Sequence, residues 1–307
     1  MKSVVVLGGY GNFARRIVAA LAHEPNTRVF VSGRDSKQAT AVAQEIGGAA
    51  EPLRLDAHAA DFTAELRKVS ATVVVHTAGP FQGQSYSVPR ACIAARAHYI
   101  DLADGREFVC GIEALDAEAK LNDALVVSGA SSLPALSSAV VDALGAQFTS
   151  IESIDHGISS GARPPGKATM DGVLAYAGKP FKQWRDGQWQ QARGWQDLTR
   201  RSYPPPINGR WIANCDVPDL DLFPERYRPV HTVQFRAGVG PTSSMIGLWL
   251  ASWLVRLGLL ASLQSWVPAL HRTASALARY GSKRSAMHVT VRGIGLNGEP
   301  AVRNWFL

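Results

Sequence analysis

Cysteine is scarce in this chain, and the sequence signatures of several enzyme classes are missing. Its 307 residues include three cysteines (Cys92, Cys110 and Cys215), which are far apart and form no CxxC pair. This argues against a disulfide framework or a metal site and is typical of a reducing compartment. The sequence has no HExxH motif, no GKS or GKT phosphate loop and no nucleophile elbow, so hydrolase and kinase chemistry have no support. The first apolar run is too short for a signal peptide, and we expect a cytoplasmic protein.

Acidic residues are few in the second half of the chain. Residues 1–150 contain 13 Lys and Arg against 15 Asp and Glu, whereas residues 151–307 contain 19 against 10. This excess of basic residues favours an acidic partner. Three kinds fit, namely a carboxylate substrate, a phosphorylated carrier and an anionic membrane surface. The alternative is a solvated basic face without a function. The cations are scattered and no recognition motif accompanies them, so we expect no nucleic acid partner.

Short β-branched runs alternate with amphipathic helical segments over the first 130 residues. Six strands are expected, and this alternation predicts an α/β domain with a doubly wound parallel sheet, a Rossmann domain, over residues 1–133. The last helix of this series is expected at Phe108–Asn122. The expected strands are Val4–Leu7, Val29–Ser32, Pro52–Leu55, Thr72–His76, Tyr99–Leu102 and Leu125–Ser128.

In residues 134–307 the strand and helix signals no longer alternate regularly, which predicts an α+β domain with a mixed sheet. A helix is expected over Pro134–Phe148, with proline near its start. Asp186-Gly187 lies between Trp184 and Trp189 and indicates a hairpin turn. Further strands are expected at Ile151–Ile158, Val230–Val239 and Met287–Gly293.

The strongest motif lies between the first expected strand and the first expected helix. Gly9-x-Gly11-x-x-Ala14 follows Val4–Leu7 directly. In this context glycines allow a tight turn and a close approach of the backbone to a diphosphate, and the helix N-terminus supplies positive potential. The motif predicts a dinucleotide site formed by Gly8, Gly9, Tyr10, Gly11, Asn12 and Phe13.

The end of the second strand predicts which dinucleotide binds. NAD-preferring sites usually place an acidic residue there, whereas this chain has Ser32-Gly33-Arg34-Asp35. Arg34 is suited to pair with a ribose 2′-phosphate, and Ser32 is suited to donate to it. Asp35 comes one residue late and is expected to cap the next helix. We therefore expect NADP(H) rather than NAD(H).

Two more strand ends reach the same edge of the sheet. Asp56 follows the third strand, where a carboxylate is positioned to contact the adenine amino group or to cap the next helix. The fourth strand ends in Thr77, Ala78, Gly79, Pro80 and Phe81. We expect this small-residue segment to run beside the nicotinamide ribose.

Together these motifs resemble the saccharopine dehydrogenase-like family. The resemblance rests on Gly8–Gly11, Ser32–Arg34, His76–Phe81 and Ala91–Asp101, and covers residues 1–135 well. It implies an NADP-binding Rossmann domain followed by a substrate domain that often forms homodimers. In such relatives the chain returns to the Rossmann domain, whereas here it stops at Leu307, so we expect either that the second domain is short or that its end is missing.

Four residues are candidates for chemistry or substrate contact. Asp101 and Asp104 follow the fifth strand, where a carboxylate can orient a substrate or relay a proton. The alternative for Asp101 is a cap on the helix near Gly105. His156 and Lys167 belong to the second domain and are candidates for substrate contact, or are simply solvated.

Residues 245–263 form an apolar stretch with a single charge, Arg256. The length matches a membrane span, but the central arginine and Gly247 and Gly258 argue against one. The stretch is expected to be a buried helix or dimer face, or a peripheral membrane or acyl-chain surface.

The resemblance implies an NADPH-dependent oxidoreductase that transfers a hydride to or from a C=N, C=O or conjugated C=C bond of a small or acyl-type metabolite. One alternative is a trans-acting acyl enoyl reductase. Another is a non-catalytic NADP(H)-binding sensor or a membrane-associated interaction module.

Overall fold

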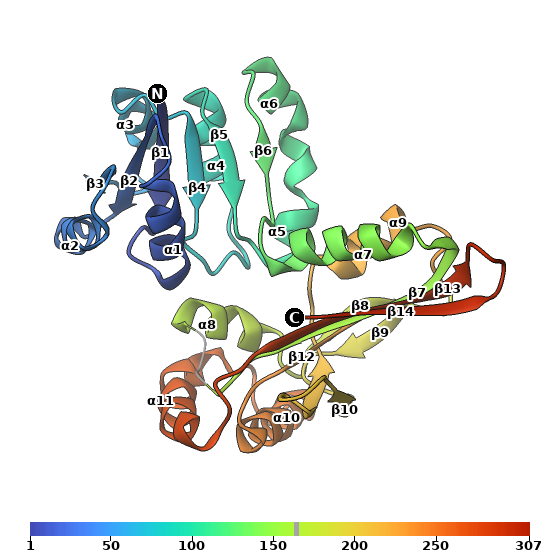
Figure 1. The fold of residues 1–307 in the computed structure, drawn as a ribbon. Coiled ribbons are helices and arrows are strands. Elements are labelled where there is room, and N and C mark those ends of the chain that lie inside the picture. The colour runs from blue at the N-terminus through green and yellow to red at the C-terminus, as the bar shows by residue number, and fades with distance from the viewer. Residues whose placement is uncertain (163–165) are drawn as a thin grey trace. The chain divides into compact units, whose positions relative to one another are not determined.

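The computed structural model describes residues 1–162 and 166–307. The chain forms two compact units, unit 1 over Met1–Ser131 and unit 2 over Ser132–Leu307 (Figure 1). The sequence pattern placed the boundary between the two domains between residues 133 and 134. Each unit has a hydrophobic core made from its own residues.

Unit 1 is built on a six-stranded parallel sheet with the strand order β3–β2–β1–β4–β5–β6. This order, which reverses direction between β1 and β4, is that of the doubly wound dinucleotide-binding fold. The fold predicted for the first half of the sequence is therefore confirmed. The strands are β1 (Lys2–Leu7), β2 (Thr27–Gly33), β3 (Ala50–Arg54), β4 (Val73–His76), β5 (His98–Asp101) and β6 (Val126–Val127). The helices are α1 (Asn12–Leu21), α2 (Ser36–Ile46), α3 (Phe62–Lys68), α4 (Ser87–Ala94), α5 (Arg106–Cys110) and α6 (Asp116–Leu121).

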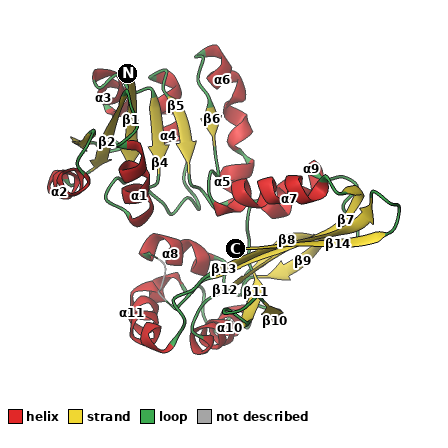
Figure 2. Ribbon diagram, viewed as in Figure 1, coloured by secondary structure: helices red, strands yellow, loops and turns green. Residues whose placement is uncertain are grey.

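Alternation along the strands explains why helices cover both faces of this sheet (Figure 2). Val4 and Val6 of β1 belong to one apolar cluster, together with side chains of α1 and α2. Val5 and Leu7 belong to a second cluster, together with side chains of α3 and α4. Because successive side chains of a strand point to opposite faces, an uninterrupted apolar strand requires a helical layer on each side.

The helix expected over Phe108–Asn122 is wrong as a single element. The chain forms α5, a 3-10 turn over Ile112–Leu115, and α6. The break lies at Gly111, where a Cβ would be 2.6 Å from the hydroxyl oxygen of Tyr86. That hydroxyl donates to the carbonyl of Phe108 at 2.8 Å, so the chain bends around a specific contact.

Unit 2 is built on a six-stranded mixed sheet with the order β10–β11–β12–β7–β13–β14, accompanied by a separate β8–β9 hairpin. Only the pairing of β12 with β7 is parallel. The expected α+β architecture is confirmed. The strands are β7 (Phe148–Ser159), β8 (Pro180–Arg185), β9 (Gln188–Arg193), β10 (Thr199–Ser202), β11 (Gly209–Asn214), β12 (Thr232–Gly238), β13 (Ala286–Gly295) and β14 (Pro300–Phe306). The helices are α7 (Ser137–Gly145), α8 (Lys167–Ala175), α9 (Asp219–Arg226), α10 (Thr242–Arg256) and α11 (Val267–Leu277).

Two sequence predictions in unit 2 had different outcomes. The hairpin turn is confirmed, because Asp186 and Gly187 join β8 to β9 with φ of 52° and 73°, as a two-residue hairpin turn requires. The helix expected over Pro134–Phe148 is too long at its C-terminal end. A helical turn over Ser132–Leu136 precedes α7, but α7 ends at Gly145 and Phe148 already pairs with Gly295 as the first residue of β7.

The apolar stretch over residues 245–263 is not one helix. Helix α10 ends at Arg256, and Gly258 follows with a φ of 74°, a conformation that commonly terminates helices. Within residues 1–162 and 166–307, no helix is both long enough and apolar enough to cross a bilayer.

Candidate dinucleotide-binding site

The loop between β1 and α1 turns tightly against the neighbouring strand β2. The Gly9 amide donates to the carbonyl of Ser32 at 2.8 Å, and the Gly11 amide donates to the carbonyl of Gly8 at 2.8 Å. A Cβ on Gly9 would lie 2.7 Å from the Ser32 nitrogen and 2.9 Å from the Val31 Cα, which is closer than atoms approach. The motif residue Gly9 is therefore required by packing.

The first turn of α1 presents main-chain donors without partners. Within the described residues, the amides of Asn12, Phe13 and Ala14 have no hydrogen-bond acceptor. The first turn contains no acidic side chain, and the residue that precedes the helix is Gly11, which has no side chain to cap it. Asn12 and Phe13 are exposed. Free amides and the positive end of the helix dipole form a cradle that fits the diphosphate of a dinucleotide.

Arg34 lies at the tip of β2, as the sequence predicted. Its side chain is exposed and forms no hydrogen bond or ion pair with any residue that the structure describes. The neighbouring carboxylate is occupied, because Asp35 caps α2 and accepts from the amides of Lys37 at 3.0 Å and Gln38 at 3.1 Å. These hydrogen bonds, with that from the Gln38 side chain as the largest contribution, lower the pKa of Asp35. The cation at this tip is free to pair with a phosphate.

The prediction that Ser32 donates to the 2′-phosphate is corrected. The Ser32 side chain is fully buried, and its hydroxyl donates to the carbonyl of Val6 at 2.9 Å. It therefore links β2 to β1 inside the sheet. Tyr10 is partly buried rather than free in the loop, because its ring packs over Gly33, where an added Cβ would lie 2.5 Å from the ring.

Asp56 lies just beyond β3 and is exposed. It accepts from the amide of His58 at 3.0 Å and so stabilises a local turn. Helix α3 begins later, after Asp61, so Asp56 does not cap it. Contact of Asp56 with adenine stays a prediction.

The segment after β4 packs against the loop between β1 and α1, and its contact with the nicotinamide ribose stays a prediction. The Thr77 amide and hydroxyl both donate to the carbonyl of Leu7, at 3.1 and 2.7 Å. A Cβ on Gly8 would lie 3.2 Å from both the Ala78 Cβ and the Thr77 hydroxyl oxygen. Residues 77 and 78 therefore border the cradle directly, with Gly79 and Pro80 next along the same loop.

Phe81 does not face the cradle, and its assignment as a cofactor contact is corrected. The side chain is buried, with its ring centroid 5.0 Å from that of His76 and 5.4 Å from that of Phe108. Phe81 thus belongs to the packing under the loop.

Asp101 is part of a buried polar chain beneath the ends of β4, β5 and β6. Its carboxylate accepts from the amides of Gly129 at 2.8 Å and Ala103 at 2.9 Å, and from the hydroxyl of Ser128 at 2.8 Å. Burial raises the pKa of Asp101, and these hydrogen bonds oppose that effect. Tyr99 extends the chain, because its hydroxyl lies 2.9 Å from Nδ1 of His76. Burial is the main reason that the pKa of His76 falls to about 4, so this imidazole is neutral at physiological pH.

The fully buried position of Asp101 corrects its assignment as a catalytic residue. Its carboxylate holds the loop after β5 to the segment after β6. Asp101 also does not cap α5, which follows Gly105. Among the described residues, no side chain accepts a hydrogen bond from the first amides of this helix.

Replacement of Asp101 by alanine is expected to lower the free energy of unfolding by about 3 kcal/mol, because two amides and a hydroxyl lose their acceptor in a buried environment. Asp101→Asn is expected to cost about 1 kcal/mol or less, since one amide oxygen still accepts from both main-chain amides. Urea unfolding monitored by circular dichroism measures both values. Equal losses in the two variants would contradict this structural role.

Asp104 lies in the loop after β5 and is accessible, in contrast to Asp101. Its carboxylate accepts from the side-chain amide of Gln82 at 3.2 Å. Burial raises the pKa of Asp104, and the hydrogen bond from Gln82 opposes that effect. The carbonyl oxygen of the same Gln82 side chain is buried and has no partner among the described residues. The Gln82–Asp104 pair is therefore polar, partly unsatisfied and located at the carboxyl edge of the sheet.

The two residues assigned to substrate contact lie in unit 2. His156 is fully buried between the rings of Phe223 and Phe235, and its Nε2 lies 3.1 Å from Oδ1 of Asp219. Ser137 donates to the same carboxylate oxygen. The assignment of His156 is wrong, because the side chain is part of the unit 2 core. Lys167 is the first residue of α8, and its side chain lies outside the described part of the chain.

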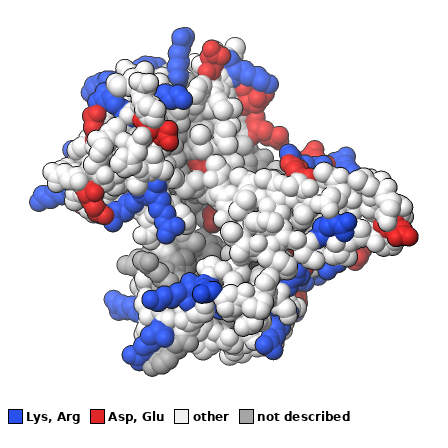
Figure 3. All heavy atoms as spheres, in the orientation of Figure 1, with Lys and Arg blue, Asp and Glu red and all other residues white. Residues whose placement is uncertain are grey.

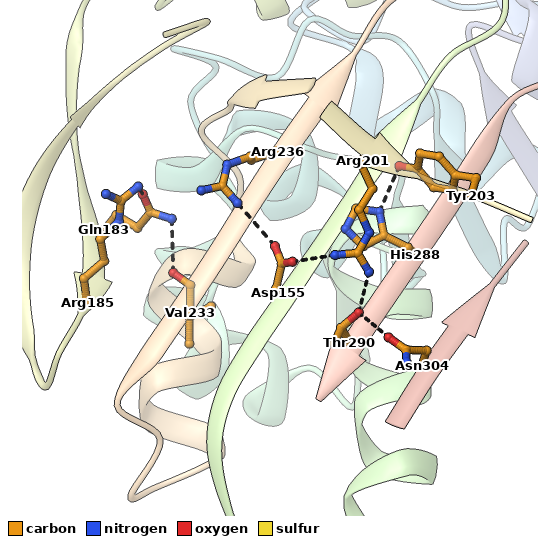
Figure 4. A network of polar contacts seen from close by, with 10 residues as sticks. All are labelled: Asp155, Gln183, Arg185, Arg201, Tyr203, Val233, Arg236, His288, Thr290 and Asn304. Carbon is orange, nitrogen blue, oxygen red and sulfur yellow. Dashed lines mark hydrogen bonds and ion pairs between the residues drawn. The ribbon is translucent and has the colours of Figure 1, made fainter. Parts of the chain in front are cut away.

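The opposite face of the unit 2 sheet carries a polar network that the sequence did not reveal (Figure 4). Asp155 of β7 accepts from Arg201 at 2.9 Å and from Arg236 at 3.5 Å. Arg201 also donates to the hydroxyl of Thr290 at 2.6 Å. One carboxylate thus holds two guanidinium groups from strands that are far apart in the sequence.

Sequence reasoning missed Gln82, Tyr99 and Ser128. A single glutamine in a loop has no pattern, and the only signal was its place directly after the motif that ends in Phe81. Tyr99 reads as an ordinary apolar strand residue, and Ser128 is 27 residues from its partner Asp101. Their contacts exist only because β4, β5 and β6 are neighbours in the sheet.

Comparison with known families supports this interpretation of unit 1. Residues 4–128 match the family model described as the saccharopine dehydrogenase NADP binding domain. The matched segment includes the cradle, Arg34 and the loop after β4, so the resemblance seen in the sequence is confirmed for this part of the chain. No curated protein matches the chain.

The whole chain is similar in structure to apo saccharopine dehydrogenase (L-Glu forming) from Saccharomyces cerevisiae, with a TM-score of 0.67 and 15% sequence identity over 100% of this chain and 85% of that chain. At this identity the likeness shows the fold alone. A dehydrogenase from Chromobacterium violaceum has a TM-score of 0.46 at 10% identity, covering 99% of this chain and 72% of that chain. GenD2 from gentamicin A biosynthesis, solved with NAD, has a TM-score of 0.45 at 13% identity with the same coverage of 99% and 72%. These two weaker likenesses carry no argument about function.

Proposed function

We propose, from the match of residues 4–128 to the saccharopine dehydrogenase NADP binding domain, that this protein is an NADPH-dependent oxidoreductase. The observation that carries the proposal is the pairing of two features at one edge of the sheet. The unpartnered amides of Asn12, Phe13 and Ala14 suit a diphosphate, and the unpaired guanidinium of Arg34 suits a 2′-phosphate. The nicotinamide, when bound, supplies or accepts the hydride.

The residues of the chain contribute binding and a proton. The Gly8–Gly11 loop and Arg34 hold the phosphates, and the Thr77–Pro80 segment borders the cradle. Asp104 is the proposed proton donor or acceptor, because its raised pKa and accessible position suit that role. Gln82 orients its carboxyl group through the 3.2 Å hydrogen bond.

The proposed reaction is hydride transfer to or from a C=N, C=O or conjugated C=C bond of a small or acyl-type metabolite. The excess of Lys and Arg in residues 151–307 favours an acidic substrate, and the family resemblance favours a homodimer. An acyl enoyl reductase is the second candidate, because α10 exposes leucine side chains that suit an acyl chain.

Turnover assays on imines, ketones and enoyl thioesters, followed through the nicotinamide absorbance, test the proposal. Asp104→Asn is expected to lower kcat about 100-fold on the active substrate, since general acid–base catalysis contributes at least that factor. The affinity for NADPH is expected to stay unchanged.

Asp123→Asn is the matched control for this experiment. Asp123 is exposed in a turn with a φ of 56°, which asparagine also adopts readily, and we expect no change in turnover. Wild-type kcat in Asp104→Asn would exclude Asp104 as the proton carrier. Tight NADPH binding without turnover on any of the three substrate classes would instead favour a non-catalytic NADP(H)-binding sensor.

A further inference from the structure

Helix α10 has two apolar faces, and only one of them packs against the protein. Met245, Leu248, Ser252 and Val255 recur at helical spacing and face the unit 2 core, where Met245 and Ser252 are fully buried. Gly247, Leu250, Leu254 and Leu257 recur with the same spacing and are exposed. A helix on the surface of a globular protein normally carries polar residues on its outer side. The outer face of α10 therefore lacks the composition of a solvated surface.

The chain that follows α10 adds to this exposed apolar surface. Leu259 is exposed just after the helix, and its amide donates to the carbonyl of Leu254 at 2.9 Å. We refer to this residue together with the outer side of α10 as the leucine face. Its large side chains and their exposed fractions are Leu250 (54%), Leu254 (42%), Leu257 (64%) and Leu259 (68%). Exposed apolar side chains that lie together mark sites where a protein meets another protein or a membrane.

The charge of the surrounding sequence distinguishes between these occupants. Residues 242–284, which include α10 and α11, contain no acidic residue and five Lys and Arg. Figure 3 shows Lys and Arg side chains among uncharged atoms on the part of unit 2 that carries α10 and α11. Arg256, at the end of α10, stacks its guanidinium 4.4 Å from the centre of the Trp253 ring and donates to the buried Gln196, so it is held by the protein itself. The cations that can meet a partner are therefore those of the segment that follows α10.

A second copy of this chain is a poor match for such a surface. A two-fold dimer through the leucine face would bring the same patch of each copy together. Cations would then face cations, and no carboxylate of residues 242–284 would offset their repulsion. An anionic bilayer offers the complementary combination, because it accepts leucine side chains at its interface and attracts Lys and Arg through its headgroups.

We propose that the leucine face docks peripherally on membranes that contain anionic lipids. Leu250, Leu254 and Leu257 enter the boundary between headgroups and acyl chains, and Lys and Arg side chains of the segment that follows α10 contact lipid phosphates. Since no described helix is long enough to span a bilayer, the contact is interfacial. This proposal does not depend on the oxidoreductase activity.

Co-sedimentation with vesicles tests the proposal. Wild-type protein is expected to bind vesicles of phosphatidylcholine and phosphatidylglycerol, and to bind pure phosphatidylcholine vesicles more weakly. Binding to the anionic vesicles is expected to weaken as salt is raised to about 0.5 M, because screening shortens the reach of the cations. Leu250→Gln combined with Leu254→Gln is expected to lower the vesicle partition coefficient at least tenfold, while glutamine retains helix propensity close to that of leucine.

Leu121→Gln combined with Leu296→Gln is the matched control. These leucines are 87% and 69% exposed and lie outside the leucine face, so vesicle binding is expected to stay at the wild-type value. Circular dichroism, measured on all variants, reports that the proteins are folded. The proposal is overturned if wild-type protein does not bind anionic vesicles or if the α10 variant binds them as wild type does. It is also overturned if that variant instead dissolves a dimer seen by light scattering without altering vesicle binding.

Discussion

Gly9→Ala is expected to lower the affinity for NADPH at least 100-fold. The added methyl group would lie 2.7 Å from the Ser32 nitrogen and 2.9 Å from the Val31 Cα, both of which belong to the main chain of a central strand and cannot rotate away. The loop must therefore shift away from β2, and the amides of the α1 N-terminus shift with it. A loss of several charge-assisted hydrogen bonds to a diphosphate, at about 1.5–3 kcal/mol each, accounts for a change of this size. Titration calorimetry with NADPH measures it.

Two further glycine variants make this result interpretable. Gly11→Ala meets only the Gly8 carbonyl oxygen, at 3.1 Å, so the fold is expected to remain while the methyl group obstructs the diphosphate. Gly247→Ala has nothing within 4 Å and is the matched control with unchanged affinity. If folded Gly9→Ala and Gly11→Ala proteins both bind NADPH as wild type does, the cradle is not the cofactor site.

Arg34→Asp is expected to lower the affinity for NADPH about 100-fold and to change that for NADH little, so that the preference moves toward NADH. The variant removes the guanidinium from the 2′-phosphate and places a carboxylate beside it, whereas NADH has a ribose hydroxyl that a carboxylate accepts from. Competition between the two cofactors in a binding titration measures the ratio directly.

Arg96→Asp is the matched control for the change of charge. Arg96 is exposed just before β5, at the amino edge of the same sheet, whereas Arg34 follows β2 at the carboxyl edge. Arg96 has a φ of 56°, which aspartate tolerates. An NADPH to NADH ratio that is the same in Arg34→Asp and in wild type would refute the assignment of NADP(H).

The sequence was sufficient for the parts of the site that depend on local structure. The glycine loop, the helix start and Arg34 all follow from residues within a few positions of a strand end, where neighbouring residues determine the backbone. The doubly wound parallel sheet of unit 1 also followed, because an alternation of apolar strands and helices has few ways to form a parallel sheet. Asp35 was identified as a cap for the same local reason.

The errors arose where the orientation of a side chain depends on tertiary contacts. Ser32 and Phe81 lie in the expected segments, but the period of two along an extended chain does not say which face a given residue takes. His156 and Asp219 are 63 residues apart, so the buried pair that they form was not visible in the sequence. Asp101 was placed at the correct edge of the sheet, yet its partners come from the segment after β6.

Because the cradle at the start of α1 consists of main-chain amides, binding of a ligand there requires almost no particular side chain. Asn12 and Phe13 can be exchanged for many other residues while their N–H groups keep the same direction. The cradle thus depends on backbone shape, and substitutions of these two side chains are expected to leave dinucleotide binding unchanged. A variant designed not to bind the dinucleotide should therefore replace the glycines, which determine that backbone shape, rather than the exposed side chains.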